Sequence, residues 1–155
     1  MTPRNIKIWI IEDEKNDAMK AFQAIKRVTP GEHYQVFWDQ TLHWGAELTE
    51  LPLAEGQIQS CKLPDIVVLD LLDENLQFAA GKFYEELRKE ERRSESPAAF
   101  VIMWSVKTGL PEVHRFVGSK VKTDRRLMFT STKTVRVLEE NLIRCVGAWR
   151  EAQLL

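Results

Sequence analysis

Short apolar runs are the feature that most restricts how this chain of 155 residues folds. Three of them stand out: Ile6–Ile11 (IKIWII), Ile66–Leu69 (IVVL) and Phe100–Trp104 (FVIMW). Their brevity and their content of β-branched and aromatic residues favour strands over buried helices. Because strands that are apolar on both faces are typical of a parallel sheet covered on both sides, the runs predict such a sheet.

The segments between these runs carry the spacing of amphipathic helices, with apolar residues every three or four positions. The expected helices are Asp17–Val28, Leu42–Leu51, Lys82–Glu91, Pro111–Gly118 and Val135–Trp149. Two weaker runs, Tyr34–Trp38 and Leu127–Phe129, complete the expected set of strands, and residues 53–63 are expected to form a loop. Asn16 or Asp17 is the expected N-cap of the first helix.

Strand and helix thus alternate about five times along the chain. This alternation predicts an α/β fold with a doubly wound, five-stranded parallel sheet flanked by helices on both faces. The length fits one domain over residues 1–155, with its core at about 5–150. We expect Trp9, Trp38 and Trp104, which lie in the apolar strands, to fill that core.

The charge balance excludes some kinds of partner. Lys and Arg number 22 and Asp and Glu 23, which leaves a net charge of −1 and no general attraction to nucleic acid or to anionic membranes. The sequence has no apolar run of the roughly 20 residues that a membrane-spanning helix needs. The start of the chain turns acidic at once and lacks the features of a signal peptide. A cytoplasmic location and two reduced thiols, Cys61 and Cys145, are therefore the expectation.

Candidate chemistry follows the ends of the strands. Glu12 and Asp13 come directly after the first run, Asp70 ends the IVVL run, and Ser105 follows FVIMW. Lys133 comes just past the last expected strand. Ligands of open parallel sheets bind at the carboxyl ends of the strands, so we expect these side chains to share one crevice.

Three carboxylates in one crevice repel one another, and a divalent cation relieves that repulsion. Ligands that are all oxygen favour a hard ion such as Mg²⁺. A carboxylate next to such an ion is able to attack phosphorus, because the metal screens the repulsion between two anions. Lys133 and Ser105 would then contact the phosphoryl oxygens.

The strings WIIEDE, PDIVVLDL and FVIMWS and the later Lys133 resemble the receiver domain of two-component response regulators over roughly residues 5–150. The resemblance implies five parallel strands and five helices. It also implies a phosphoprotein that takes a phosphoryl group from a histidine kinase or a histidine phosphotransfer protein and then signals to a downstream protein target in a phosphorelay. Such a receiver would stand alone, and the resemblance leaves a homodimer open.

The resemblance carries roles over to individual positions. Asp70 stands where the phosphoryl acceptor stands. Asp13 would bind Mg²⁺ directly and Glu12 through water, and the backbone carbonyl of Leu72 would be the remaining protein ligand. Ser105 takes the place of the switch hydroxyl, and Lys133 that of the lysine that pairs with phosphate.

Three departures from the receiver pattern bear on this interpretation. The segment after Asp70 has no Pro, and Gly81 comes a few residues late, so this loop is longer and more acidic than usual. Thr130 stands where receivers commonly carry an aromatic residue. The stretch between Ser105 and Lys133 is also long, which makes Lys107 and Lys120 fallback candidates for the phosphate-binding lysine.

Other functions remain open at this stage. A pseudo-receiver would use the same fold only to bind proteins, without phosphorylation. A Toprim-like metal-dependent phosphotransfer domain fits less well, because its Asp-x-Asp motif is matched here only by Asp70-x-x-Asp73. A flavodoxin-like cofactor binder fits least, since the carboxylates at residues 12–14 would repel a phosphate group after the first strand. Because its product would be a signal, we do not expect the protein to be an enzyme in the usual sense.

Overall fold

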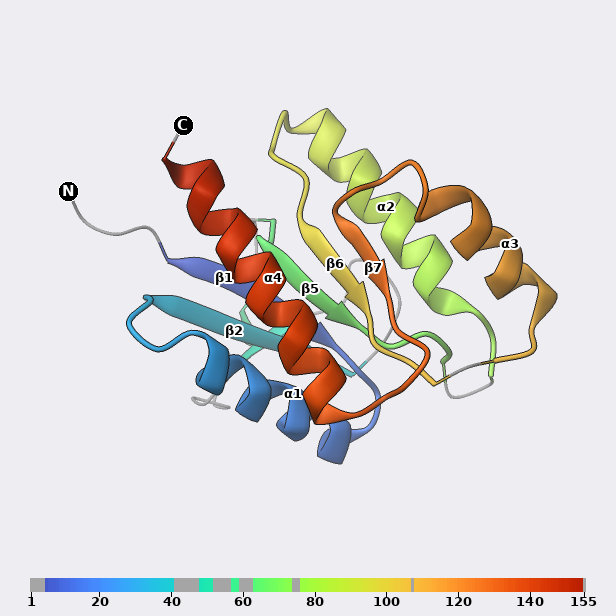
Figure 1. Ribbon diagram of the computed structural model, residues 1–155, viewed down its shortest axis with the longest axis horizontal. Helices are drawn as coiled ribbons and strands as arrows, with labels where there is room; N and C mark the ends of the chain where they lie inside the picture. Colours follow the sequence, from blue (N-terminus) through green and yellow to red (C-terminus); the bar gives the residue numbers. More distant parts are fainter. Residues whose placement is uncertain are drawn as a thin grey trace.

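The computed structural model describes residues 5–40, 48–51, 57–58, 63–73, 76–106 and 108–154. Strands and helices alternate over most of this length (Figure 1). In chain order they are β1 (Ile6–Ile11), α1 (Lys15–Val28), β2 (Tyr34–Asp39), β3 (Leu48–Leu51), β4 (Gln57–Ile58), β5 (Ile66–Leu69), α2 (Ala79–Arg93), β6 (Phe100–Met103), α3 (Pro111–Lys120), β7 (Leu127–Phe129) and α4 (Val135–Gln153).

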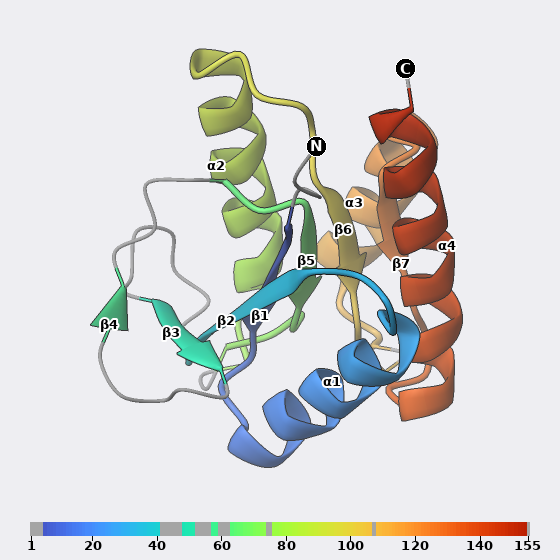
Figure 2. The ribbon, with the colours of Figure 1, turned by 90° about the vertical axis from the view of Figure 1, so that its left-hand side faces the viewer.

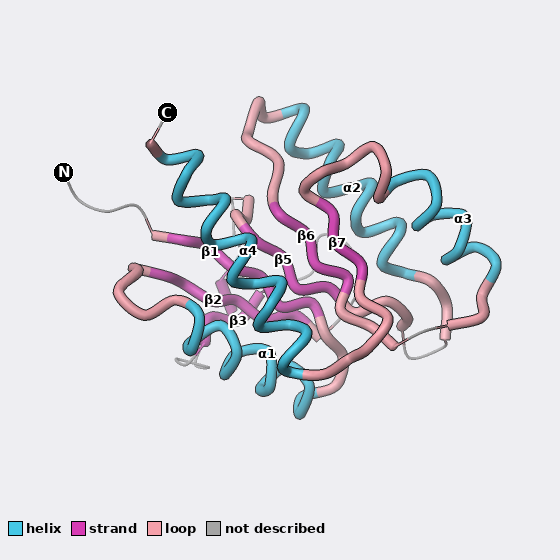
Figure 3. Tube along the Cα trace, in the orientation of Figure 1, coloured by secondary structure: helices cyan, strands magenta, loops and turns pink. Residues whose placement is uncertain are grey.

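One sheet runs through the molecule in the order β4-β3-β2-β1-β5-β6-β7 (Figure 3). Five neighbouring strands of this sheet, β2, β1, β5, β6 and β7, are all parallel to one another. This confirms the predicted five-stranded parallel sheet, whose order matches a flavodoxin-like α/β fold. β3 pairs antiparallel with β2, and β4 antiparallel with β3, so the two extra strands extend the sheet beyond the predicted edge.

The helix expected at Leu42–Leu51 is wrong over its last four residues, which form β3. Residues 41–47 lie outside the part of the chain that the structure describes. β3 forms a ladder along β2, with Val36 opposite Leu51 and Trp38 opposite Thr49, and so pairs the edge that β2 would otherwise expose. Helix propensity is a weak preference that such pairing overrides. The expected loop at residues 53–63 also contains a strand, β4, and the described residues hold four helices where the receiver pattern has five.

The remaining elements lie close to their predicted positions. β1, β5 and β7 have the predicted bounds, while α2 and α4 extend several residues further than expected. The N-cap of α1 is Glu14, an extended residue whose side chain makes no capping hydrogen bond. Asn16 and Asp17 are therefore not the cap, and Asp17 lies in the first turn of the helix.

The sheet separates two apolar cores (Figure 2). On one face, Ile8 and Ile10 of β1 pack in a cluster with residues of α1 and α4. On the other face, Trp9 and Ile11 pack in a cluster with residues of α2 and α3. Alternate residues of a strand point to opposite faces, so a strand that supplies both cores must be apolar throughout. This explains why IVVL and FVIM are apolar throughout and why Lys7 is the one charged residue of β1, at its half-buried second position.

The connections on the two sides of β1 use helices on opposite faces of the sheet. The connection from β1 to β2 passes through α1, and the connection from β5 to β6 passes through α2. Between β1 and β5 the strand order therefore reverses. Such a reversal opens a crevice at the carboxyl ends of the two strands, which is the usual ligand site of this architecture.

Candidate functional site

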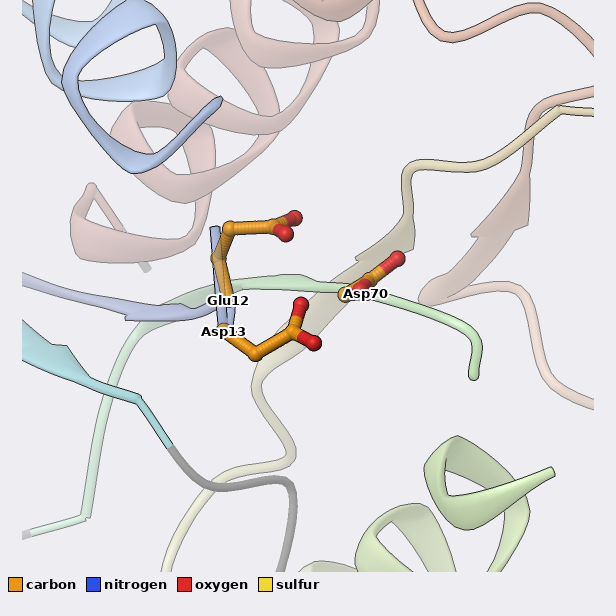
Figure 4. Close-up of side chains that lie close together, drawn as sticks. All are labelled: Glu12, Asp13 and Asp70. Carbon is orange, nitrogen blue, oxygen red and sulfur yellow. The ribbon is translucent and has the colours of Figure 1, made fainter. Parts of the chain in front are cut away.

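Three carboxylates meet where β1 and β5 end. Glu12 and Asp13 follow β1, and Asp70 follows β5. One carboxylate oxygen from each residue lies within 4.8 Å of the other two. Figure 4 shows the side chains of Glu12 and Asp13 extending from the end of β1 on the side where Asp70 lies. This spacing suits a single cation held by oxygen ligands, so the donor set fits Mg²⁺.

Backbone hydrogen bonds fix the positions of the two loops that carry these groups. The backbone N–H of Asp70 donates to the carbonyl of Ile11 at 2.9 Å, which continues the β1–β5 pairing up to the acidic residues. The N–H of Glu12 donates to the carbonyl of Asp39 at 3.0 Å. The indole N–H of Trp38 donates to the carbonyl of Glu12 at 2.8 Å. The carboxylates therefore project from backbone that neighbouring strands hold in place.

Lys133, in the loop between β7 and α4, reaches this cluster. Its ammonium lies 2.9 Å from Glu12 Oε2, 3.3 Å from Asp70 Oδ1 and 3.2 Å from Asp17 Oδ2. The lysine side chain is only 16% exposed, so its positive charge is largely shielded from water. Of the two candidate lysines that the structure describes, Lys133 is the one that lies against the carboxylates.

One of the two fallback lysines, Lys120, lies within the described residues and has another partner. Lys120 lies at the end of α3 and pairs with Glu85 at 3.2 Å. Lys107 lies outside the part of the chain that the structure describes.

Burial and mutual repulsion disturb the titration of the cluster. Burial is the largest effect on Glu12, and together with the charge of Asp70 it raises the pKa of Glu12 to about 8, even though Lys133 opposes the shift. Burial also raises the pKa of Asp70, against the effect of Lys133 and of the Leu71 N–H, which donates to Asp70 Oδ1 at 2.8 Å. A cation bound among these carboxylates would favour their ionised forms and relieve the repulsion between them.

The same carboxylates stabilise the ammonium of Lys133. Burial alone would lower the pKa of Lys133. The hydrogen bond and charge of Glu12, with the charge of Asp70 and the hydrogen bond to Asp17, outweigh burial and raise that pKa. Lys133 is therefore fully charged at neutral pH and supplies a fixed positive charge beside Asp70.

Ser105 lies in the loop after β6, and its hydroxyl bonds to the backbone of that same loop. Its Oγ donates to the carbonyl of Val106 at 2.9 Å. Its backbone N–H donates to Thr130 Oγ1 at 2.9 Å, and Thr130 Oγ1 lies 3.1 Å from the Ser105 carbonyl. Both residues are buried. Thr130, where receivers commonly carry an aromatic residue, thus ties the loop after β6 to the end of β7.

The loop after Asp70 is the main departure from the receiver pattern. Asp73 Oδ1 accepts a hydrogen bond from the N–H of Gln77 at 3.0 Å, and Leu76 has a positive φ of 59° and is 71% exposed. Gly81 lies inside α2, where a Cβ would meet the ring of Phe78 at 2.7 Å. Its lack of a side chain therefore serves helix packing rather than a turn. Leu72 is half-buried in the bend after Asp70, and its role as a carbonyl ligand stays a prediction.

Two neighbours of the cluster were not expected from the sequence as parts of the site. The sequence suggests Asp17 only as a helix cap, but it lies in the first turn of α1 and its carboxylate is 3.2 Å from the Lys133 ammonium. Trp104 was considered only as core, yet its ring lies 5.4 Å from the Lys133 ammonium. No spacing rule connects residues 104 and 133, because the contact depends on how the loops after β6 and β7 approach each other.

The fold and this crevice define the class of protein: a parallel α/β protein with an acidic pocket and a paired lysine at the point where its strand order reverses. No protein-family model matches the chain, and no curated protein matches it. A solved structure, described as a yeast Spc42 trimeric coiled coil (amino acids 181–211) fused to another structure, is similar with a TM-score of 0.59 and 16% identity over 98% of this chain and 85% of that chain. A coiled coil of that length cannot cover this chain, so the similarity lies in the fused part and concerns the fold alone.

Proposed function

We propose that the protein is a stand-alone receiver that accepts a phosphoryl group on Asp70. The observation that carries this proposal is the contact of Lys133 with Asp70 and Glu12, at the crevice where Asp13 supplies a third carboxylate. An acceptor carboxylate, an acidic cation site and a fixed ammonium are the groups that phosphoryl transfer to a carboxylate needs.

In the proposed step a carboxylate oxygen of Asp70 attacks the phosphorus of a donor. The new O–P bond forms as the bond from phosphorus to the leaving atom breaks, and the electron pair of that bond goes to the leaving group. With a phosphohistidine donor the leaving atom is an imidazole nitrogen, which then takes up a proton from solvent. Lys133 neutralises part of the charge on the phosphoryl oxygens, because it is already charged and lies within 3.3 Å of Asp70.

Glu12, Asp13 and Asp70, with the Leu72 carbonyl, would hold Mg²⁺. The bound ion would offset the repulsion between the incoming phosphoryl group and the carboxylates. A histidine kinase or a histidine phosphotransfer protein is the proposed donor, and a downstream protein the proposed target. None of the described helices combines the length and apolar character that a membrane crossing requires. We infer that the protein acts in the cytoplasm, where such kinases present their donor.

Asp70→Asn tests the proposal. The wild-type protein, incubated with Mg²⁺ and the small donor acetyl phosphate, is expected to gain the mass of one phosphoryl group, and Asp70→Asn is expected to gain none. Asp73→Asn is the matched control, because it removes a nearby carboxylate of the same loop while keeping an acceptor for the Gln77 N–H.

Equal labelling of Asp70→Asn would show that the acceptor is another residue. A wild-type protein that gains no mass, and whose NMR spectrum beryllofluoride with Mg²⁺ leaves unchanged, would instead favour the pseudo-receiver, in which the acidic pocket is only a remnant and the protein acts by binding partners.

A further inference from the structure

An uncharged aromatic side chain, that of Trp104, lies close to the ammonium of Lys133. The ring centroid of Trp104 lies 5.4 Å from the lysine ammonium, within the range at which an aromatic face attracts a cation. Trp104 is 1% exposed and directly precedes Ser105 at the end of β6. Its face is therefore held by the core and cannot turn away from the lysine.

The same tryptophan also holds the backbone next to the lysine. Its indole N–H donates to the carbonyl of Thr134 at 3.0 Å. Trp104 thus contacts the side chain of Lys133 and the main chain of the following residue. Two contacts at adjacent positions restrict both the path of the β7–α4 loop and the direction in which the long lysine side chain extends.

The three ion-pair partners of the ammonium among the described residues are carboxylates with other roles. Glu12 and Asp70 belong to the set that would hold a cation, and Asp17 also pairs with Lys20 at 3.8 Å. Any cation or phosphoryl group that enters the pocket competes for these oxygens. The contacts of Trp104 do not compete, because neither its ring nor its N–H is a ligand for a metal or accepts phosphate.

We propose that Trp104 is a positioning residue that keeps Lys133 directed at Asp70 while the carboxylates change partners. The role in phosphoryl transfer rests on the proposed function, whereas the contact itself does not. The indole N–H of Trp104 bonds to the loop that carries Lys133, whereas the indole N–H of Trp149, which is 7% exposed in α4, has no hydrogen-bond partner among the described residues.

The first test examines the contact and needs no phosphorylation. The indole N–H signals of the full chain are recorded by ¹H–¹⁵N NMR and assigned with single Trp→Phe variants. Lys133→Met is expected to shift the Trp104 signal and to leave that of Trp149 in place. A Trp104 signal that does not respond to Lys133→Met overturns the proposal, even if the protein is a working receiver.

The second test examines the role, with labelling by acetyl phosphate and Mg²⁺. Trp104→Leu removes the ring and the N–H, and we expect labelling at saturating donor to slow by about tenfold, because a misplaced catalytic group costs rate rather than binding. Trp104→Phe keeps an aromatic face and is expected to recover most of the rate. Trp149→Phe is the control for a buried indole lost elsewhere and should label like the wild type.

These tests separate the possible failures. Labelling of Trp104→Leu at the wild-type rate, with Asp70→Asn unlabelled, overturns the positioning role and leaves the proposed function standing. A wild-type protein that is not labelled at all removes the proposed function and with it the role in transfer, and the NMR test then decides the contact alone. The Mg²⁺ dependence of labelling is expected to be the same in Trp104→Leu and wild type, and a changed dependence would contradict a role confined to Lys133.

Discussion

At the scale of single residues, the hydroxyl of Thr130 has an unusual position for a receiver-like site. It accepts a hydrogen bond from the N–H of Ser105 and lies within hydrogen-bond distance of the Ser105 carbonyl. One side chain therefore bonds both backbone polar groups of Ser105, in the loop that follows β6. Ser105 itself donates to Val106. For Ser105 to contact a phosphoryl oxygen, its hydroxyl has to leave that carbonyl, and Thr130 fixes the backbone around which it would rotate.

Thr130→Val is expected to destabilise the protein by about 1–3 kcal/mol, because it leaves the buried N–H of Ser105 without its acceptor. Valine has nearly the same shape, so the change isolates the hydroxyl. Urea unfolding of the wild type and the variant measures the difference. Thr130→Ser, which keeps the hydroxyl, should lose clearly less stability. A Thr130→Val variant as stable as the wild type, or one that loses less stability than Thr130→Ser, would contradict a stabilising role of the hydroxyl.

Much of the candidate site could be predicted at this scale, and the reason is geometric. Glu12, Asp13 and Asp70 directly follow apolar runs, and the ends of parallel strands meet at one edge of a sheet. Lys133 was less certain because a long stretch separates it from Ser105. The contacts of Asp17 and Trp104 with Lys133 depend on loop paths and side-chain directions, which periodicity does not encode.

At the scale of elements, an ionic network attaches α2 to the loop before β7. Tyr84 and Arg88 of α2 both hydrogen-bond to Asp124 Oδ2, and the backbone N–H of Arg126 donates to Asp124 Oδ1 at 2.9 Å. Arg88 also pairs with the buried Glu91 at 2.7 Å. The network lies beside an open pocket of about 450 Å³ between α2 and the α3–β7 loop. Within this network the carboxylates of Glu91 and Asp124 pair with the guanidinium of Arg88, which is almost fully buried.

Asp124→Asn is expected to lower the free energy of unfolding at pH 7 by about 1–3 kcal/mol, since Arg88 loses a charged partner. Burial alone would raise the pKa of Asp124, but the hydrogen bonds of Tyr84 and Arg126 and the charge of Arg88 hold it below its ordinary value of 3.8. A lowered pKa in the folded state gives stability that is present above pH 3.8 and is lost as the pH falls further.

The difference between wild type and Asp124→Asn should therefore shrink as the pH falls below about 3.8, because only the wild type has this carboxylate to protonate. Urea unfolding of both proteins at a series of pH values, from neutral to acidic, measures this difference in the free energy of unfolding. A difference that stays constant into the acid range would mean that the charge of Asp124 is not what stabilises the contact.

Strands that are buried on both faces could be predicted from the sequence. A strand that forms because it pairs with a free sheet edge could not. β1, β5 and β7 were predicted at their observed bounds because an apolar run that supplies two cores has little freedom. β3 was mistaken for a helix because its residues carry no strand alternation, and its structure comes from the free edge of β2. The edge of a sheet is a property of the assembled fold, so no local pattern indicates it.

At the scale of the whole molecule, the acidic pocket opposes folding when it is empty. Folding brings the carboxylates of Glu12, Asp13 and Asp70 together. Burial first, and then the charge of a neighbouring carboxylate, disfavours the ionised forms of Glu12 and Asp70, and Lys133 offsets this only in part. A ligand that binds only the folded state raises the free energy of unfolding. The proposed cation is therefore expected to act on global stability as well as on chemistry.

Mg²⁺ at about a hundred times its dissociation constant should raise the free energy of unfolding by about 2.7 kcal/mol. Thermal unfolding with and without Mg²⁺, at matched ionic strength, measures this effect. Asp13→Asn should unfold at a higher temperature than the wild type without Mg²⁺, because repulsion is relieved, and should respond little to the ion. An equal response of wild type and Asp13→Asn would exclude Asp13 from the proposed site, whereas Asp73→Asn should respond like the wild type.

The place of β1 in the sheet has a further consequence. With β3 and β4 added beyond β2, β1 is the fourth of seven strands, and it is paired on both sides. Amides of such a strand exchange with solvent mainly when the whole protein opens, while surface loops open locally at far lower cost. Glu12 and Asp13 directly follow this strand, whose amides we expect to exchange slowly, while Ser105 and Lys133 lie in the loops after β6 and β7. We therefore expect the two halves of the pocket to differ in how readily they fluctuate. A binding partner is expected to shift the loops that carry Lys133 and Ser105 more easily than the backbone that carries Glu12 and Asp13.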